Sequence, residues 1–246
     1  RLVVSNDDAN TITIIDAQTL QKIKSYKFDM VRPRNIIASK SFDTLYTTSR
    51  TGNVVYKIYD DTMHKISIDG KPINTDISAT TPDPWDLKMS PDFTKYFIAC
   101  SQSNEVRILN VTTDEVLKVI PVGTTPQQMA LSKNKPYLFI TCHDDPASGL
   151  KAKGSVYVIN YETLEVVKRI EAGFYEPYGV AVDDKTGSVY VISKNLTSDG
   201  PAPHHGSPCG GRNGYYQVID INTLEPISGK RYEILTNPTA MQIRFN

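Results

Sequence analysis

Short apolar segments alternate with polar turns along the whole chain, and this alternation itself repeats. Each repeat opens with a proline and an apolar strand, followed by a turn, a second strand, a polar loop and two further strands. The repeats recur about every 50 residues, opening at Pro33, Pro84, Pro126, Pro177 and Pro238. Four short strands in a unit of this length are typical of a propeller blade. The sequence therefore predicts an all-β chain, a β-propeller of four-stranded antiparallel blades.

The predicted strands are rich in Val, Ile, Tyr and Thr and are separated by turn residues. In the unit that opens at Pro84 we expect strands over 85–89, 96–100, 106–109 and 116–120. No segment has a 3.6-residue apolar period, so no helix is predicted. The two following units predict strands over 129–131, 137–142, 155–160, 166–170, 179–182, 188–193, 216–219 and 230–234.

The two ends of the chain bear on how many blades there are. Residues 1–29 predict three strands, over 2–5, 11–15 and 22–28, and residues 240–245 could supply the missing inner strand. Such a splice would close a ring of five blades and cover its open edges. The alternative is a seven-bladed ring of which this chain is a part. We interpret residues 1–246 as a single propeller domain that lacks an N-terminal segment, because the chain starts inside a predicted strand.

Composition excludes some partners. The chain has 27 basic and 27 acidic residues and no basic stretch, so binding to nucleic acid is not expected. No apolar run approaches the roughly 20 residues of a membrane helix, although a lipid anchor could lie upstream of Arg1. The three cysteines allow at most one disulfide. Cys100 holds the same place in its unit as Cys142, and we interpret it as a small buried side chain, with a disulfide to Cys142 as the alternative.

Several segments resemble the YVTN-repeat β-propellers, also called YncE-like proteins. The resemblance lies in LVVSNDDANTITIID at 2–16, NEVRILN at 104–110, GSVYVIN at 154–160 and YGVAV at 178–182. It implies a seven-bladed propeller, exported to the periplasm or cell surface of a prokaryote, that acts as a binding or scaffold module. The chain departs from this family pattern in its blade number and in two long insertions, at 144–153 and 195–214.

Strand direction predicts where a binding site lies. In a four-stranded blade, the loop before the first strand and the loop after the second strand share one end of the sheet. The residues that follow the prolines therefore lie beside both insertions, and loops on a rigid scaffold are where function concentrates. The candidate ligand-binding residues are Arg34, Trp85, Gln127 and Tyr178. The alternative is that these side chains only pack between blades.

The two insertions concentrate the histidines and cysteines. Cys142 and His143 begin the first insertion, while His204, His205 and Cys209 lie in the second. Imidazole and thiolate ligands favour copper or zinc, although the spacing matches no standard zinc motif. The competing interpretation is a disulfide between Cys142 and Cys209 that links the two loops, which suits an oxidising compartment.

The remaining polar positions favour structure over catalysis. Asp16, Asn110, Asn160 and Asp220 recur at the end of a third strand, where Asx side chains bond to their own backbone. No nucleophile elbow and no Ser-His-Asp set is recognisable. We therefore expect a non-enzymatic module of the bacterial envelope, in the periplasm or at the cell surface, with an envelope protein or a polysaccharide as partner. The alternative is a copper- or zinc-binding propeller with redox or hydrolytic activity.

Overall fold

The computed structural model describes residues 1–49, 52–76, 82–144, 153–204 and 211–243. These residues form strands and turns without a helix, as the absence of a 3.6-residue period predicts. No helix in the described ranges is long and apolar enough to cross a membrane. The chain divides into two compact units, Arg1–Val119 and Ile120–Asn246, which are described separately.

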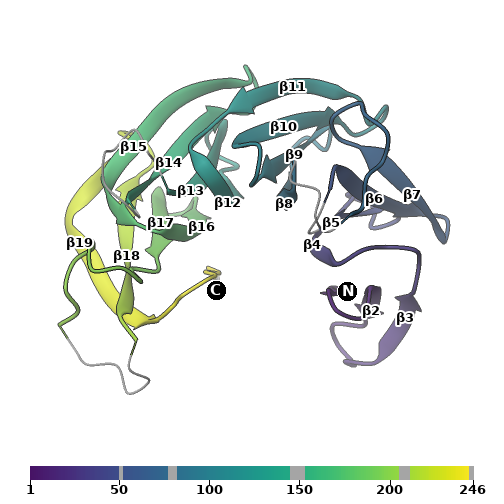
Figure 1. Cartoon of the computed structure of the whole chain (residues 1–246), viewed down its shortest axis with the longest axis horizontal. Helices are drawn as coiled ribbons and strands as arrows, with labels where there is room; N and C mark the ends of the chain where they lie inside the picture. Colours follow the sequence, from purple (N-terminus) through teal and green to yellow (C-terminus); the bar gives the residue numbers. More distant parts are fainter. Residues whose placement is uncertain (50–51, 77–81, 145–152, 205–210, 244–246) are drawn as a thin grey trace. The chain divides into compact units, whose positions relative to one another are not determined.

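Unit 1 contains one three-stranded sheet and two four-stranded sheets, all antiparallel (Figure 1). Sheet A has the order β1-β2-β3, sheet B the order β4-β5-β6-β7, and sheet C the order β8-β9-β10-β11. The strands of sheets A and B are β1 (Leu2–Asn6), β2 (Thr11–Ile15), β3 (Lys22–Tyr26), β4 (Pro33–Ala38), β5 (Leu45–Ser49), β6 (Val54–Tyr59) and β7 (Thr62–Ser67). The strands of sheet C are β8 (Pro84–Met89), β9 (Lys95–Cys100), β10 (Glu105–Asn110) and β11 (Val116–Pro121).

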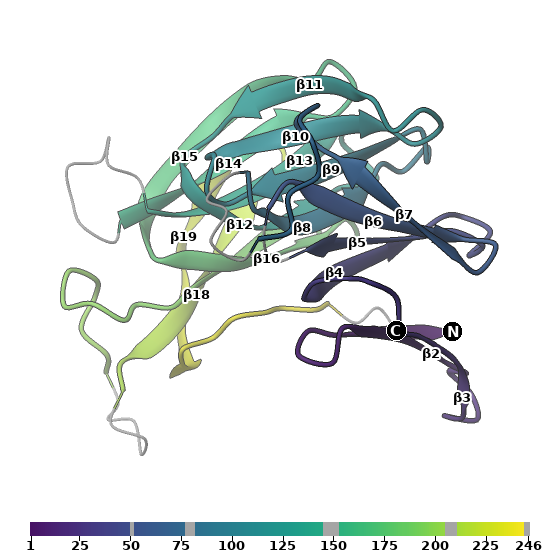
Figure 2. The same cartoon turned by 45° about the vertical axis from the view of Figure 1, so that its right-hand side comes forward.

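Unit 2 contains two four-stranded antiparallel sheets (Figure 2). Sheet D comprises β12 (Thr124–Leu131), β13 (Tyr137–Asp144), β14 (Lys153–Asn160) and β15 (Glu165–Tyr175). Sheet E comprises β16 (Pro177–Asp183), β17 (Ser188–Ser193), β18 (Asn213–Asp220) and β19 (Glu225–Thr236). The strand order within each sheet follows the chain, which confirms the predicted four-stranded repeat.

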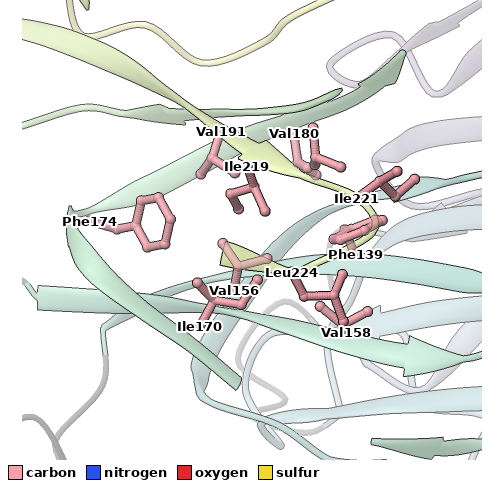
Figure 3. Packing of buried hydrophobic residues seen from close by; sticks show 11 residues of the cluster. Phe139, Val156, Val158, Ile170, Phe174, Val180, Val191, Ile219, Ile221 and Leu224 are labelled. Carbon is pink, nitrogen blue, oxygen red and sulfur yellow. The ribbon is translucent and has the colours of Figure 1, made fainter. Parts of the chain in front are cut away.

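Each pair of neighbouring sheets within a unit is held by buried apolar side chains. Sheets D and E enclose the cluster drawn in Figure 3, to which Phe139 and Val156 contribute from sheet D and Val191 and Ile219 from sheet E. In unit 1, Tyr46 of sheet B packs against Tyr96 of sheet C, with ring centroids 5.1 Å apart. Successive residues of a strand point to opposite faces, and nearly every residue of the second strands β5 and β9 is buried, so these two strands are covered on both faces.

The turns that end the third strands have the structural role expected of them. Asn160 accepts hydrogen bonds from the backbone N–H groups of Glu162 and Thr163, at 2.8 and 3.0 Å. Leu164 then adopts a left-handed φ of 59° and donates its N–H to the Asn160 carbonyl. The same side-chain bonding recurs at Asp16, Asn110 and Asp220. These Asx residues therefore close turns, as predicted.

The C-terminal segment continues the repeat only in part. A Cβ on Gly214 would lie 2.6 Å from Pro238, just as a Cβ on Gly154 would lie 2.4 Å from Pro177. Pro238 thus packs against sheet E as Pro177 packs against sheet D. Residues 240–243 form no strand, and Phe245 lies outside the described residues. The predicted fourth strand for sheet A, and with it the closed ring, stays a prediction.

Candidate functional site

The residues that open each four-stranded sheet lie at the same end as the loop after its second strand. Pro126 pairs with Cys142 and Pro177 with Ser193 in unit 2. Pro33 pairs with Ser49 and Pro84 with Cys100 in unit 1. Both insertions follow the second strand, so within unit 2 they share this end with the openings of sheets D and E. The predicted common end is confirmed within each sheet.

A β-bulge follows each of these prolines. The pairing register shifts between Pro33 and Ile36, and again just after Pro84, Pro126 and Pro177. Bulges bend a strand and redirect a side chain. The four candidate ligand-binding residues (Arg34, Trp85, Gln127 and Tyr178) each lie in such a bulge. In the sequence these bulges leave one sign: the apolar alternation begins three residues after the proline, at Ile36, Leu87, Met129 and Val180.

The residue before each proline has a left-handed backbone conformation. Its φ is 49° at Arg32, 55° at Asp83, 53° at Thr125, 53° at Glu176 and 48° at Asn237. This region costs free energy for residues other than glycine, so surrounding contacts must hold it. The hydroxyl of Ser101 donates to Asp83 Oδ2 at 2.6 Å, and the Arg32 N–H donates to Asn10 Oδ1 at 2.8 Å. These bonds fix the direction in which each opening residue leaves the turn.

In unit 1 the opening residues of sheets B and C stack on each other. The Arg34 guanidinium carbon lies 3.4 Å from the centroid of the Trp85 ring, and the Asn35 amide donates to the Trp85 carbonyl at 2.6 Å. Both Arg34 and Trp85 remain partly exposed. A cation–π contact of this kind contributes about 0.5–2 kcal/mol. The pair therefore joins two sheets and still presents a charged, aromatic surface.

The neighbouring carboxylate in sheet C is already neutralised. Asp86 is buried, and Lys88 donates to both of its carboxylate oxygens at 2.9 Å. A buried charge is tolerated when it is paired in this way. Asp86 thus serves as the partner of Lys88.

In unit 2 the two candidate residues differ. Gln127 is only 4% exposed, and its amide donates to the Thr125 carbonyl at 3.2 Å. Tyr178 is partly exposed, and Lys194 Nζ lies 3.7 Å from the centroid of its ring. The hydroxyl of Thr141 in sheet D donates to the Tyr178 carbonyl at 2.6 Å. Unit 2 therefore also presents a cation–π pair at the opening end of a sheet, with the cation supplied by the segment after the second strand.

Sequence reasoning missed Lys194. It follows Ser193, the residue that pairs with Pro177, and its N–H donates to the Glu176 carbonyl, so the strand register places it opposite the residue before the proline. The contact of its side chain with Tyr178 depends on the bulge after Pro177, which the sequence does not reveal.

The predicted metal or disulfide residues are only partly placed. Cys142 is buried, and His143 Nδ1 lies 3.2 Å from Asp144 Oδ1. The His204 side chain is 88% exposed. His205 and Cys209 lie outside the described residues, and so does the proposed Cys142–Cys209 link. Within the described ranges no three His, Cys, Asp or Glu side chains form a group that could hold a metal.

The third cysteine behaves as expected from its position. Cys100 is a free thiol with no exposed surface. Burial raises the pKa of the Cys100 thiol above its ordinary value. The side chain therefore acts as a small apolar residue in the cluster between sheets B and C.

Comparison with known proteins supports the fold. No protein-family model matches the chain. The chain is 28% identical over 194 residues to a curated protein, antigen Lp49 of Leptospira interrogans; the match covers 72% of this chain and 40% of the antigen. The chain thus spans less than half the length of this relative.

Among solved structures, the chain is similar to hydrazine synthase of Kuenenia stuttgartiensis, with a TM-score of 0.71 and 15% sequence identity. The superposition covers 89% of this chain and 59% of the enzyme chain. At this identity the likeness shows the fold alone. The chain is therefore an all-β protein with a multi-blade, propeller-like fold.

Proposed function

We propose that this chain is a non-enzymatic binding module, of the YVTN-repeat type, that presents the opening ends of its sheets to a protein or a polysaccharide. The observation that carries the proposal is the repeated placement of partly exposed cation–π pairs at these ends. Arg34 with Trp85 does so in unit 1 and Lys194 with Tyr178 in unit 2. Aromatic and arginine side chains are the residues that dominate binding at protein surfaces.

Export to the bacterial envelope is part of the same proposal. Its support is the similarity to a leptospiral protein described as an antigen, together with the repeat pattern of the sequence. Closure of the sheets into a ring belongs to the proposal as well, because closure would protect the outermost sheets from pairing with other chains. Fold by itself does not fix function, so a binding experiment must decide.

The copper- or zinc-binding alternative stays a prediction without a supporting observation in the described ranges. Elemental analysis of protein purified without chelator tests it. Stoichiometric metal that is lost when His143 and His204 are both replaced by alanine would favour this alternative. A mass measurement that finds Cys142 and Cys209 crosslinked would exclude thiolate ligation by these two residues.

The binding proposal is tested by capture from a bacterial envelope extract. The immobilised chain should retain a defined protein or polysaccharide, identified by mass spectrometry or sugar analysis. Retention should fall when Arg34 or Tyr178 is replaced by alanine. The matched control is Lys185→Ala, an exposed lysine in the turn after β16, at the other end of sheet E. Equal retention by all variants, or none by the original chain, would refute the proposal.

A further inference from the structure

The second insertion is fastened to sheet E by specific hydrogen bonds. The Asn195 amide donates to the carbonyls of Pro201 and Asn213 at 3.0 and 2.9 Å. The Arg212 guanidinium donates to the carbonyls of Asn195, Gly200 and Pro201 at 2.9–3.2 Å. These bonds are made to carbonyls that a free loop would expose to water. The described part of the insertion, residues 195–204 and 211–214, is therefore held against sheet E, and we call it the wall.

Close packing leaves no room for a side chain at Gly200. A Cβ at that position would lie 2.0 Å from Asn195 Oδ1 and 3.0 Å from the Tyr175 ring. Glu176, which is buried, accepts the Leu196 N–H and fixes the start of the insertion. The conformation of the segment is thus set by its own side chains and by the end of sheet D.

A small cavity lies between this wall and the last two strands of sheet E. Its volume is about 140 Å³. The wall contributes Pro201 and His204, and strands β18 and β19 contribute Tyr215, Arg231 and Glu233. At about 30 Å³ per water molecule, it holds the equivalent of four or five waters. An ammonium nitrogen, an α-carbon and a carboxylate together have five heavy atoms, so a group of this size matches the cavity volume.

Charges of both signs line this cavity. Arg231 and Glu233 are two residues apart on β19, so their side chains leave the same face of the strand, with Cα atoms about 7 Å apart. Glu233 is oriented by the His204 N–H and by the Asn213 amide, each at 2.7 Å. Arg231 extends over the Tyr215 ring, its guanidinium carbon 5.5 Å from the centroid. The cavity therefore presents a carboxylate that two hydrogen bonds orient and an exposed guanidinium above an aromatic ring.

An apolar hollow adjoins the charged cavity. It has a volume of about 740 Å³ and shares Asn213 and Glu233 with the cavity. Ile234, Leu235 and Pro238 line it, and Leu235 is 83% exposed. A leucine exposed to this degree gains free energy when a ligand covers it. Glu233 thus marks the boundary between a polar and an apolar compartment.

From this arrangement we propose that the site binds a free α-amino acid with an apolar side chain. The ligand carboxylate pairs with the Arg231 guanidinium, which presents two parallel N–H donors to a carboxylate. The ligand ammonium pairs with Glu233, and the apolar side chain covers Leu235 in the hollow. A zwitterion contacts both charges at once, whereas a simple acid or amine contacts only one of them. This site is separate from the cation–π pairs and does not depend on the proposed function.

Isothermal titration of the full chain tests the proposal with three probes. L-leucine should bind with a dissociation constant in the micromolar to millimolar range. The probe 4-methylpentanoate lacks the ammonium, and 3-methylbutylamine lacks the carboxylate; each should bind at least about tenfold more weakly, since each loses a charge-assisted hydrogen bond. No heat with leucine up to about 10 mM would overturn the proposal. Binding of the amine as tight as that of leucine would overturn it too.

Variants at neighbouring positions separate binding from folding. Arg231→Gln should weaken leucine binding at least about tenfold, whereas Lys230→Gln, on the other face of β19, should not change it. Leu235→Ser should weaken leucine binding but leave alanine binding unchanged, because alanine does not reach the hollow. Urea unfolding of each variant confirms that it folds. Arg231→Gln protein that folds and still binds leucine as the original chain does would refute the assignment.

Discussion

A single hydroxyl joins sheet E to the end of sheet D, and its removal should measurably destabilise unit 2. Tyr215 lies in β18 and is 4% exposed. Its hydroxyl accepts the Tyr175 N–H at 2.9 Å and donates to the Gly173 carbonyl at 2.8 Å. Burial raises the pKa of Tyr215, so the hydroxyl stays protonated and able to donate across the ordinary pH range.

The replacement Tyr215→Phe removes both hydrogen bonds and leaves the ring in place. Each bond contributes about 1 kcal/mol net, and the Tyr175 N–H and the Gly173 carbonyl both lose this partner. We therefore expect the free energy of unfolding to fall by about 2 kcal/mol. Urea unfolding followed by fluorescence measures this change as a shift of the midpoint at constant slope. Hydrogen exchange at the Tyr175 amide should become faster in the same variant.

Two further phenylalanine variants make the test specific. Tyr216→Phe changes the next residue, whose ring lies on the opposite face of β18, and should alter the free energy of unfolding by less than about 0.5 kcal/mol. Tyr56→Phe removes the equivalent hydroxyl in sheet B, which accepts the Val31 N–H at 2.8 Å, and should cost about 1 kcal/mol. The reasoning fails if Tyr215→Phe and Tyr216→Phe have equal stability, or if exchange at Tyr175 is unchanged.

Three further predictions follow from local geometry. Gly154→Ala should lower the free energy of unfolding by about 1–3 kcal/mol, because its Cβ would lie 2.3 Å from the Cys142 carbonyl oxygen. The control Gly211→Ala should be nearly neutral, because its Cβ would meet only Thr236, at 3.3 Å. Equal melting temperatures of the two variants would contradict this prediction. Although partial burial opposes it, hydrogen bonding by the Ser90 and Thr94 hydroxyls lowers the pKa of Asp92 from 3.8 to about 2, so its stabilising effect is present above pH 4 and is lost as the pH falls towards 2. Carbon NMR titration should show this pKa moving back towards 3.8 in Ser90→Ala, and no movement would count against the hydrogen bond. Asn160→Ala should cost about 1 kcal/mol in urea unfolding through loss of its two backbone contacts, and the exposed control Glu162→Ala should cost nothing measurable.

The repeat made much of the fold predictable. Strand positions followed from alternation, because a strand that is buried on one or both faces must place apolar residues at fixed intervals. The turns at Asn110 and Asn160 were predictable for a local reason, since an Asx side chain bonds to the backbone two or three residues on. The position of the openings beside the insertions followed from strand direction alone.

Other features were out of reach because they depend on contacts between distant residues. Strand β19 extends over Glu225–Thr236, far beyond the predicted 230–234, because it pairs with β18 along nearly its whole length despite two register shifts. The Lys194–Tyr178 contact depends on the bulge after Pro177. The cavity near Arg231 depends on the hydrogen bonds by which Asn195 and Arg212 hold the second insertion against the sheet. None of these leaves a periodic mark in the sequence.

Each opening proline pairs with the second strand in the same register, so the strand framework is independent of the segment that follows the second strand. Pro126 with Cys142 and Pro177 with Ser193 form the same junction, yet quite different lengths of chain follow them. Segments inserted after such a junction do not strain the strands, because the sheet is already complete on both sides of the gap. The connecting segment can therefore differ in length and sequence between sheets while the framework stays the same.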